Sequence, residues 1–302
     1  MHFLFPFLQQ IPVNQFLRYD IEPSSDVVRL LLDEGAAGDN SPPKRYRYSL
    51  AKRLVAQWER RGLEIPEEFY EKYAACLLES GSDSNDDVQT TVVSYFVTRE
   101  TPIRSIEAPN LIAFNGGTGY RTWEAALVLV HYLHDRELDA TRVLELGCGT
   151  GIIGISCALR ARPPEQVVLT DIDGDVLAVC AKNIALNDVA DVCTIQPYAW
   201  GEPLESPLDA PPFDLIVGAD ITYDPTLVPL LVRSLSLLLK NQNNKALIAC
   251  TKRNPDTLKV FEDECAGQQL ACTVLETTRY AGDLIWISDD APDVVIYAIT
   301  SV

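Results

Sequence analysis

The sequence lacks any apolar run of the roughly 18–20 residues that a membrane-spanning helix needs, so we expect no membrane association. The apolar start at residues 1–10 is short and has neither a basic flank nor a small-residue cleavage site, which argues against a secretory signal. The chain has 302 residues, 47% hydrophobic and 23% charged. This composition is ordinary for a soluble globular protein of one large domain, or of one large and one smaller domain.

The sequence also lacks the spacing that marks a metal or redox site. None of its eight cysteines forms a CxxC pair, which excludes the usual zinc ribbon and thioredoxin patterns. Most of them stand among apolar residues and are predicted to be small core side chains in a reduced, cytoplasmic protein. His131 and His134 would share a helix face, but no third ligand is evident, so we expect no metal.

Positive charge is scarce, because 25 lysines and arginines face 43 acidic residues and give a net charge of −18. A protein that grips phosphate backbones usually carries a basic face, so we do not expect direct nucleic-acid binding. An acidic enzyme suits a basic partner such as a lysine-bearing protein, and we expect the chain itself to be a monomer. Residues 44–61 are the exception, with seven basic residues against Glu59. They indicate either a solvated helix face or a contact with phosphate or an acidic surface.

Two regions are predicted from the change in pattern along the chain. Residues 1–80 are typical of helices, at 26–34, 48–61 and 66–79, with Ser24 or Ser25 as the N-cap of the first. Residues 80–87 (SGSDSNDD) are polar and acidic, as in a loop between domains. We therefore predict a helical N-terminal region at 1–87, for substrate recognition or packing, and a catalytic domain at 88–302.

The second region is predicted to be an α/β domain. Residues 88–99 and 103–114 form a candidate β-hairpin, and residues 122–133 a helix. Strands are then expected at 142–146, 166–170, 192–197, 215–219 and 246–251, with helices at 152–160, 174–186, 226–239 and 255–265. Such alternation predicts a parallel sheet covered on both faces. Two consecutive strands at 270–278 and 294–300 complete a Rossmann-like, seven-stranded, mostly parallel sheet with an antiparallel C-terminal hairpin.

A candidate nucleotide-type site follows the first parallel strand. That strand runs into Gly147, Cys148, Gly149, Thr150 and Gly151, and a helix begins immediately afterwards. Glycines let the backbone approach a ligand, and a helix N-terminus presents free N–H groups. Asp171 ends the next strand, where a carboxylate can accept both hydroxyls of a ribose.

Two cofactors compete for this site. Residues 149–154 match GxGxxG, the dinucleotide fingerprint, but two further residues separate the strand from its first glycine. Glu145, a buried acid beside the glycine turn, would repel a pyrophosphate. It suits the cationic amino-acid end of S-adenosylmethionine, which NAD lacks. The residues therefore favour methyl transfer over hydride transfer.

The residues after the fourth parallel strand are candidates for the chemistry. In an α/β sheet the carboxyl ends of the strands form the ligand crevice, which places Asp220 and Tyr223 near a reacting methyl group. An attacking lysine amine must be neutral and becomes cationic as it accepts the methyl. A carboxylate can orient the amine and stabilise the new charge, and an aromatic ring can border the methylated cation. A cap for the helix near Thr226 is the structural alternative for Asp220.

Five segments together resemble the seven-β-strand methyltransferase family 16, whose characterised members mostly methylate protein lysines. They are TGYRTWEAAL (118–127), VLELGCGTGIIGI (143–155), LTDID (169–173), YAWGE (198–202) and FDLIVGADITYD (213–224). The resemblance implies cofactor contacts by Trp123, Gly147 to Gly149, Asp171, Trp200 and Ala219. The helical N-terminal region resembles that of the elongation factor 2 lysine methyltransferases, which implies elongation factor 2 as the protein substrate.

Two alternatives stay open from the sequence. One alternative is methylation of another protein or of a nucleic-acid amino group. Enzymes that methylate adenine or glutamine use an Asn/Asp-Pro-Pro-aromatic turn, and Ile221 and Thr222 replace both prolines here. The other is a catalytically inactive binding or assembly module on the same fold, against which the intact Glu145, Asp171 and Asp220 argue.

Overall fold

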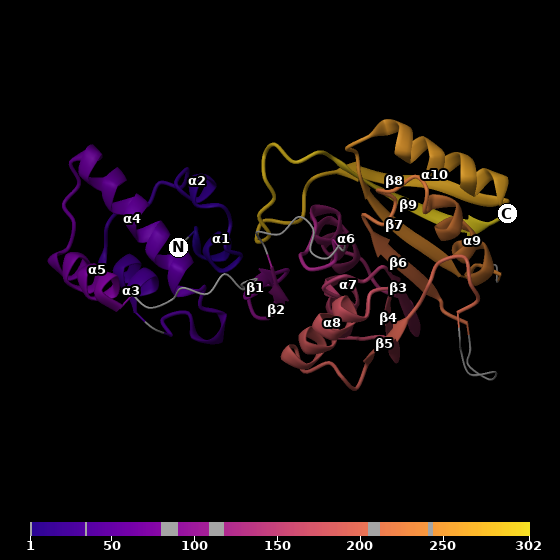
Figure 1. Ribbon diagram of the computed structural model, residues 1–302, viewed down its shortest axis with the longest axis horizontal. Coiled ribbons are helices and arrows are strands. Elements are labelled where there is room, and N and C mark those ends of the chain that lie inside the picture. The colour runs from indigo at the N-terminus through magenta and orange to yellow at the C-terminus, as the bar shows by residue number, and fades with distance from the viewer. Residues whose placement is uncertain (1, 34, 80–89, 109–117, 205–211, 241–243) are drawn as a thin grey trace.

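The computed structural model describes residues 2–33, 35–79, 90–108, 118–204, 212–240 and 244–302. Figure 1 shows a group of helices at the N-terminal end beside a twisted sheet that carries helices on both faces. The predicted acidic loop at 80–87, and residues 109–114 of the predicted hairpin, lie outside the described residues. No helix in the described part of the chain is long and apolar enough to cross a membrane.

The N-terminal helices lie close to their predicted positions. They are α1 (Leu4–Leu8), α2 (Val13–Phe16), α3 (Ser25–Leu32), the short 3-10 turn η1 (Gly38–Asn40), α4 (Lys44–Arg61) and α5 (Glu67–Glu79). Ser24 is the N-cap of α3, since its hydroxyl accepts a hydrogen bond from the backbone N–H of Val27. Helix α4 begins four residues before the predicted start, directly after Pro43. Its first turn is basic rather than apolar and so gave no periodic signal.

These helices share a core of their own. Trp58 and Phe69 are fully buried and pack edge to face, and the indole of Trp58 donates a hydrogen bond to the carbonyl of Ile21. Arg47 is also buried, because its guanidinium donates to the carbonyls of Leu31, Asp33 and Pro42. One of the seven basic residues of the 44–61 run is therefore a structural side chain that satisfies backbone carbonyls around the end of α3.

A hydrogen-bonded glutamine ties the N-terminal helices to the rest of the chain. The Gln9 side chain donates to the carbonyl of Trp286 and accepts from its backbone N–H, both at 2.7 Å. The predicted hairpin is present but shorter than expected, as β1 (Thr91–Phe96) and β2 (Pro102–Glu107). Phe96 of β1 is buried in the core of the N-terminal helices. Strand β2 is held by Asn183 and Asn187, whose side-chain oxygens accept hydrogen bonds from its backbone N–H groups.

The large sheet has the predicted seven strands, in the order β5-β4-β3-β6-β7-β9-β8. The parallel strands are β3 (Arg142–Leu146), β4 (Gln166–Asp171), β5 (Cys193–Pro197), β6 (Leu215–Ala219) and β7 (Lys245–Thr251). The antiparallel strands β8 (Leu270–Thr278) and β9 (Val294–Ser301) close one edge. The fold prediction is confirmed.

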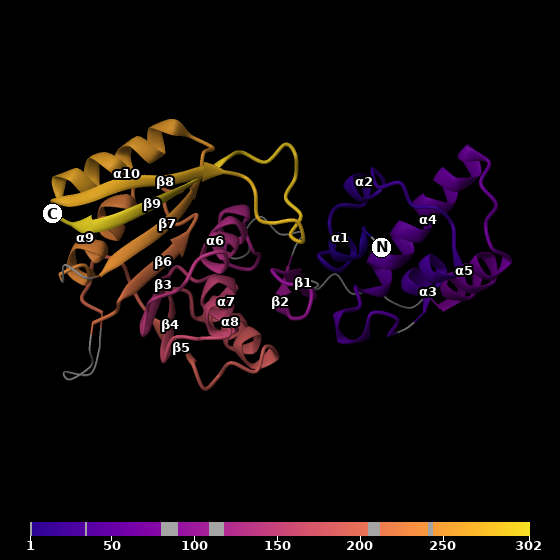
Figure 2. The same cartoon turned by 180° about the vertical axis from the view of Figure 1, so that it is seen from behind.

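Alternating side chains divide the interior into two layers. On one face pack α6 (Glu124–His134), α7 (Ile152–Ala158) and α8 (Gly174–Leu186); on the other pack α9 (Val228–Leu238) and α10 (Pro255–Gly267). Figures 1 and 2 show these two groups on opposite sides of the sheet. Within β3, Val143 belongs to the layer with α6, α7 and α8, and Leu144 and Leu146 belong to the layer with α9 and α10. Successive side chains of a strand point to opposite faces of the sheet. Seven of the eight cysteines are buried and the eighth is half-buried, as predicted.

The sheet order places the candidate site. The chain proceeds outward from β3 to β4 and β5, and then returns to β6 on the other side of β3. Ligands bind in such α/β sheets at the carboxyl ends of the strands where this reversal occurs. Gly147 and Asp220 directly follow the two strands that flank this point.

Candidate functional site

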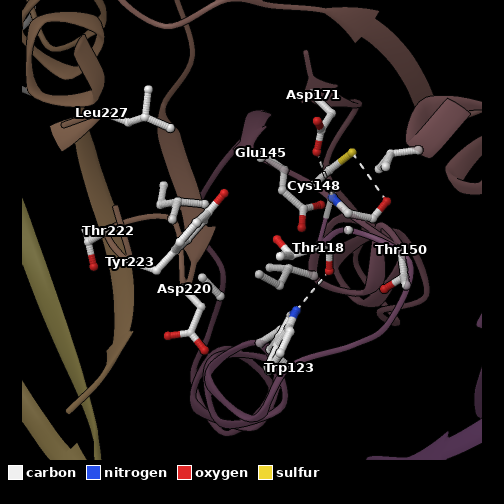
Figure 3. Close-up of a pocket in the computed structure, with 18 of the residues that line it drawn as sticks. Thr118, Trp123, Glu145, Cys148, Thr150, Asp171, Asp220, Thr222, Tyr223 and Leu227 are labelled. Atoms are coloured by element: carbon white, nitrogen blue, oxygen red, sulfur yellow. Dashed lines mark hydrogen bonds between the residues drawn. The ribbon is translucent and has the colours of Figure 1, made fainter. Parts of the chain in front are cut away.

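A cavity of about 770 Å³ opens at this reversal point, within the size range of small-molecule sites. Ten of the eleven candidate residues line it: Trp123, Glu145, Gly147, Cys148, Gly149, Asp171, Trp200, Ala219, Asp220 and Tyr223. Gly151 does not. Figure 3 shows Asp220 and Tyr223 across the cavity from Asp171 and Cys148. The structure thus brings together side chains that the sequence places up to a hundred residues apart.

The glycine loop after β3 has a backbone that other residues adopt at a cost. Gly147, Gly149 and Gly151 have φ values of +59°, +52° and +81°. A Cβ on Gly147 would meet a methyl group of Ile221 at 2.7 Å. One on Gly151 would meet the Cys180 sulfur at 2.6 Å, on the side away from the cavity. Gly151 therefore shapes the loop from a position that does not line the cavity.

Asp171 holds the glycine loop from the end of β4. Its Oδ2 accepts from the backbone N–H of Gly149 at 3.2 Å, and its Oδ1 accepts from that of Asp173 at 3.1 Å. Burial raises the pKa of this carboxyl, and the two backbone hydrogen bonds oppose that rise. Each oxygen retains acceptor capacity on the cavity side. The next residue, Ile172, lines the cavity with its side chain 74% exposed.

Glu145 lies deeper, within β3. It is 1% exposed, and its carboxylate accepts from the backbone N–H of Gly154 at 2.8 Å, in the first turn of α7. Burial raises the pKa of Glu145 to about 8, although the hydrogen bond from Gly154 works in the opposite direction. No basic side chain pairs with Glu145 among the described residues. A cationic group in the cavity would supply the missing counter-charge.

Asp220 has an uncommon backbone conformation and a carboxylate that is held by the neighbouring strand. Its φ is +51°, in the left-handed region that is uncommon except for glycine, asparagine and aspartate. Thr251, at the end of β7, donates to both carboxylate oxygens, from its backbone N–H at 2.8 Å and from its hydroxyl at 2.7 Å. The Arg253 guanidinium lies 3.8 Å from the same carboxylate. Burial raises the pKa of Asp220, and Thr251 and Arg253 oppose the rise.

The helix-cap alternative for Asp220 is wrong. The N-cap of α9 is Leu227, with no side-chain capping bond, and Asp224 closes a turn just before it, since its Oδ1 accepts from the backbone N–H and the hydroxyl of Thr226. Tyr223 stands at the rim with 61% of its side chain exposed. Its ring is therefore open to solvent at the mouth of the cavity that Asp220 lines.

Sequence reasoning missed three residues of this site. Thr251 is the last residue of β7, and Ile172 directly follows β4. Asp220 was predicted because it follows a parallel strand, and a search at the end of every parallel strand would also have found these two residues. Arg253 gave no sequence signal. Its guanidinium lies 4.8 Å from the centre of the Trp123 ring and 3.4 Å from Glu124, so it bridges the first turn of α6 to Asp220.

Trp123 is fixed in this wall. Its indole N–H donates to the carbonyl of Thr118 at 3.0 Å, and the Arg121 guanidinium lies 4.4 Å from its ring centre. Trp200 is packed partly into the second core layer, and its ring would touch a Cβ placed on Gly147. Both tryptophans line the cavity together with the glycine loop.

The chain is similar to known proteins over most of its length. Residues 112–264 match the lysine methyltransferase family. Protein-lysine N-methyltransferase EFM3 of Saccharomyces cerevisiae is 33% identical over 239 residues, 72% of this chain and 68% of the yeast protein. Human protein-lysine N-methyltransferase EEF2KMT is 26% identical over 262 residues, 81% of this chain and 77% of that protein. EEF1A lysine methyltransferase 3 of Xenopus tropicalis is 32% identical over 155 residues, 49% of this chain and 65% of that protein.

Proposed function

This chain belongs to the lysine methyltransferase family, and from that premise we propose that it transfers a methyl group from S-adenosylmethionine to a lysine of translation elongation factor 2. The observation that carries the proposal is the single cavity in which Glu145 and Asp171 flank the glycine loop on one side while Asp220 stands on the other. One side provides acceptors for a cationic nucleoside, and the other a carboxylate for an amine.

The residues of the first side fit S-adenosylmethionine. Asp171 would accept the two ribose hydroxyls with its free lone pairs, while its backbone contacts keep it in place. Glu145 would face the cationic methionine end, close to Gly147 and Trp123. Trp200 and the exposed Ile172 would cover the adenine. Gly147 and Gly149 leave no Cβ in the way, and Cys148 and Ala219 line the remaining wall.

The residues of the second side fit a lysine amine. When bound, S-adenosylmethionine supplies a methyl group on a sulfonium, an electrophile that needs no metal or covalent nucleophile. The protein must align a neutral amine with that methyl and match the positive charge that develops on the nitrogen. Asp220 is placed to accept a hydrogen bond from the amine and to stabilise that charge, and Tyr223 borders the path by which the side chain enters.

The choice of elongation factor 2 rests on the N-terminal helices. They resemble those of the elongation factor 2 enzymes, and the match to human EEF2KMT covers 81% of the chain, too much to fit within residues 88–302. We propose that residues 1–87 help to recognise this large folded substrate, in the cytoplasm where it acts. Other protein lysines are the nearest alternative, since EEF1A lysine methyltransferase 3 is similar over about half of this chain.

The proposal is tested by incubating the purified protein with labelled S-adenosylmethionine and a cell lysate. We expect one labelled protein, identified by mass spectrometry as elongation factor 2 with a methylated lysine. A different labelled protein would keep the chemistry and overturn the substrate. Label in nucleic acid would overturn both. Binding of S-adenosylmethionine without transfer to any lysate component would support the inactive module instead.

A further inference from the structure

Four basic side chains of α4 form an exposed stripe on an otherwise acidic protein. Arg45, Lys52, Arg53 and Arg60 are all exposed, and their spacing of 7, 1 and 7 residues keeps them within about 100° of the helix circumference. Between them on the same face lie only Ser49 and Ala56, also exposed. The stripe is about 22 Å long at 1.5 Å per residue.

The other basic residues of the run are engaged elsewhere. Arg47 is buried against backbone carbonyls, and Arg61 pairs with Asp20 at 2.9 Å. Arg45, Lys52, Arg53 and Arg60, by contrast, form no ion pair within the described part of the chain. Glu59, beside the stripe, accepts a hydrogen bond from the Tyr70 hydroxyl. Four cationic side chains are thus left without an acidic partner among the described residues of a protein of net charge −18, although the Arg60 Nε also donates to the carbonyl of Ala56 at 3.0 Å.

The stripe begins near the candidate active site. Tyr46, next to Arg45, lines a second cavity of about 480 Å³ between the N-terminal helices and the sheet-bearing part of the chain. Arg121 and Thr122 line both this cavity and the cavity that holds Asp220. From that end α4 leads outward along the N-terminal helices (Figure 1). A protein whose lysine reaches Asp220 is large enough to extend along α4.

We propose that this stripe docks an acidic surface of the protein substrate, an inference that rests on the proposed function. Charge complementarity over four side chains would orient the substrate and accelerate encounter more than it would tighten the final complex. A nucleic acid fits less well. The remainder of the chain would repel a continuous phosphate backbone, and none of the six residues of the stripe face is aromatic; the exposed Tyr70 lies beside it, with its hydroxyl bonded to Glu59. A folded protein can present a limited acidic patch and avoid that repulsion.

The test reverses the stripe with Arg45→Glu, Lys52→Glu, Arg53→Glu and Arg60→Glu together. A matched control reverses four exposed basic residues of the sheet-bearing part that do not line the site cavity: Lys182→Glu, Arg233→Glu, Lys240→Glu and Lys245→Glu. Both variants change the net charge equally. Thermal melting and S-adenosylmethionine affinity, measured first, are expected to match the wild type for both, because the substituted side chains are solvent-exposed.

Methylation is then measured on the intact protein that the wild type labels and on a peptide cut from it around the methylated lysine. We expect the stripe variant to raise KM for the intact protein at least about tenfold at low salt. Its kcat and its rate on the peptide should stay unchanged. Added salt should raise the wild-type KM and lower that of the variant, because salt screens the attraction in the first case and the repulsion between like charges in the second.

Three outcomes would overturn the inference. An unchanged KM for the intact protein, or an equal increase in the control variant, would remove the stripe from docking while leaving the proposed function intact. If ribonuclease treatment of the substrate erased the difference between wild type and variant, an RNA would be the occupant. Absence of any labelled protein with the wild type would overturn the proposed function and, with it, this inference.

Discussion

Thr251 donates hydrogen bonds to both carboxylate oxygens of Asp220, from its backbone N–H at 2.8 Å and from its hydroxyl at 2.7 Å. The two residues end adjacent parallel strands, β7 and β6, and are 31 positions apart in the chain. This contact holds the carboxylate in one orientation while the backbone of Asp220 has a positive φ. An orientation fixed before the substrate arrives requires no reorganisation during the reaction.

Thr251→Val should therefore lower kcat by about 10- to 150-fold, because it removes one charge-assisted hydrogen bond worth roughly 1.5–3 kcal/mol and preserves the side-chain volume. Thr251→Ser, which retains the hydroxyl, is the matched control and should keep most of the activity. Steady-state kinetics with saturating S-adenosylmethionine measures both. Equal loss in the two variants would mean that packing of the methyl group, rather than the hydrogen bond, is what matters.

Asp171→Ala should weaken S-adenosylmethionine binding by about 1.5–3 kcal/mol for each charge-assisted bond lost. Calorimetry measures the affinity. Because Asp171 also accepts from Gly149 and Asp173 within the protein, melting temperature must be followed as well. Unchanged affinity would remove Asp171 from the cofactor site, and binding of NAD in place of S-adenosylmethionine would overturn the cofactor proposal.

Glu145 should couple cofactor binding to proton release. Burial raises its pKa to about 8 in the free protein, so at neutral pH it is mostly protonated, and a cationic ligand favours the ionised form. Binding below pH 8 should thus release up to one proton, and affinity should rise with pH by at most about tenfold per unit until it levels off. Calorimetry in buffers of different ionisation enthalpy counts the protons. Glu145→Gln should abolish the release; if it persists, another group titrates.

Arg253 and Glu124 should shift the pH dependence of turnover in opposite directions. Arg253 lowers and Glu124 raises the pKa of Asp220, whose carboxyl is buried and also bonded to Thr251. In Arg253→Gln the pKa of Asp220 rises, so the acidic limb of the kcat profile should move to higher pH. In Glu124→Gln it should move to lower pH. Profiles that move together, or that do not move, would contradict ionisation of Asp220 as the origin of that limb.

The centre of the sheet was predictable from sequence because β3, β4, β6 and β7 are buried on both faces. The run at 142–146 between polar residues, for example, gave the bounds of β3 as the structure has them. The contacts that fix the site were not predictable, since Thr251 meets Asp220, and Arg253 meets Trp123, only after the sheet and α6 have assembled. No local pattern signals the positive φ of Asp220 either, or that its carboxylate bonds to Thr251 at the end of β7 and not to the start of α9. The first turn of α4 was missed because its residues are mostly basic and show no apolar periodicity.

The most direct test is transfer of labelled methyl from S-adenosylmethionine to protein lysine by Asp220→Asn, beside the wild type. Asparagine keeps the volume and tolerates a positive φ, so the fold should survive. The account predicts that turnover falls by about 100-fold or more while S-adenosylmethionine affinity stays within a few-fold. Near-normal turnover by Asp220→Asn would contradict it, because the carboxylate would then not be the group that receives the amine.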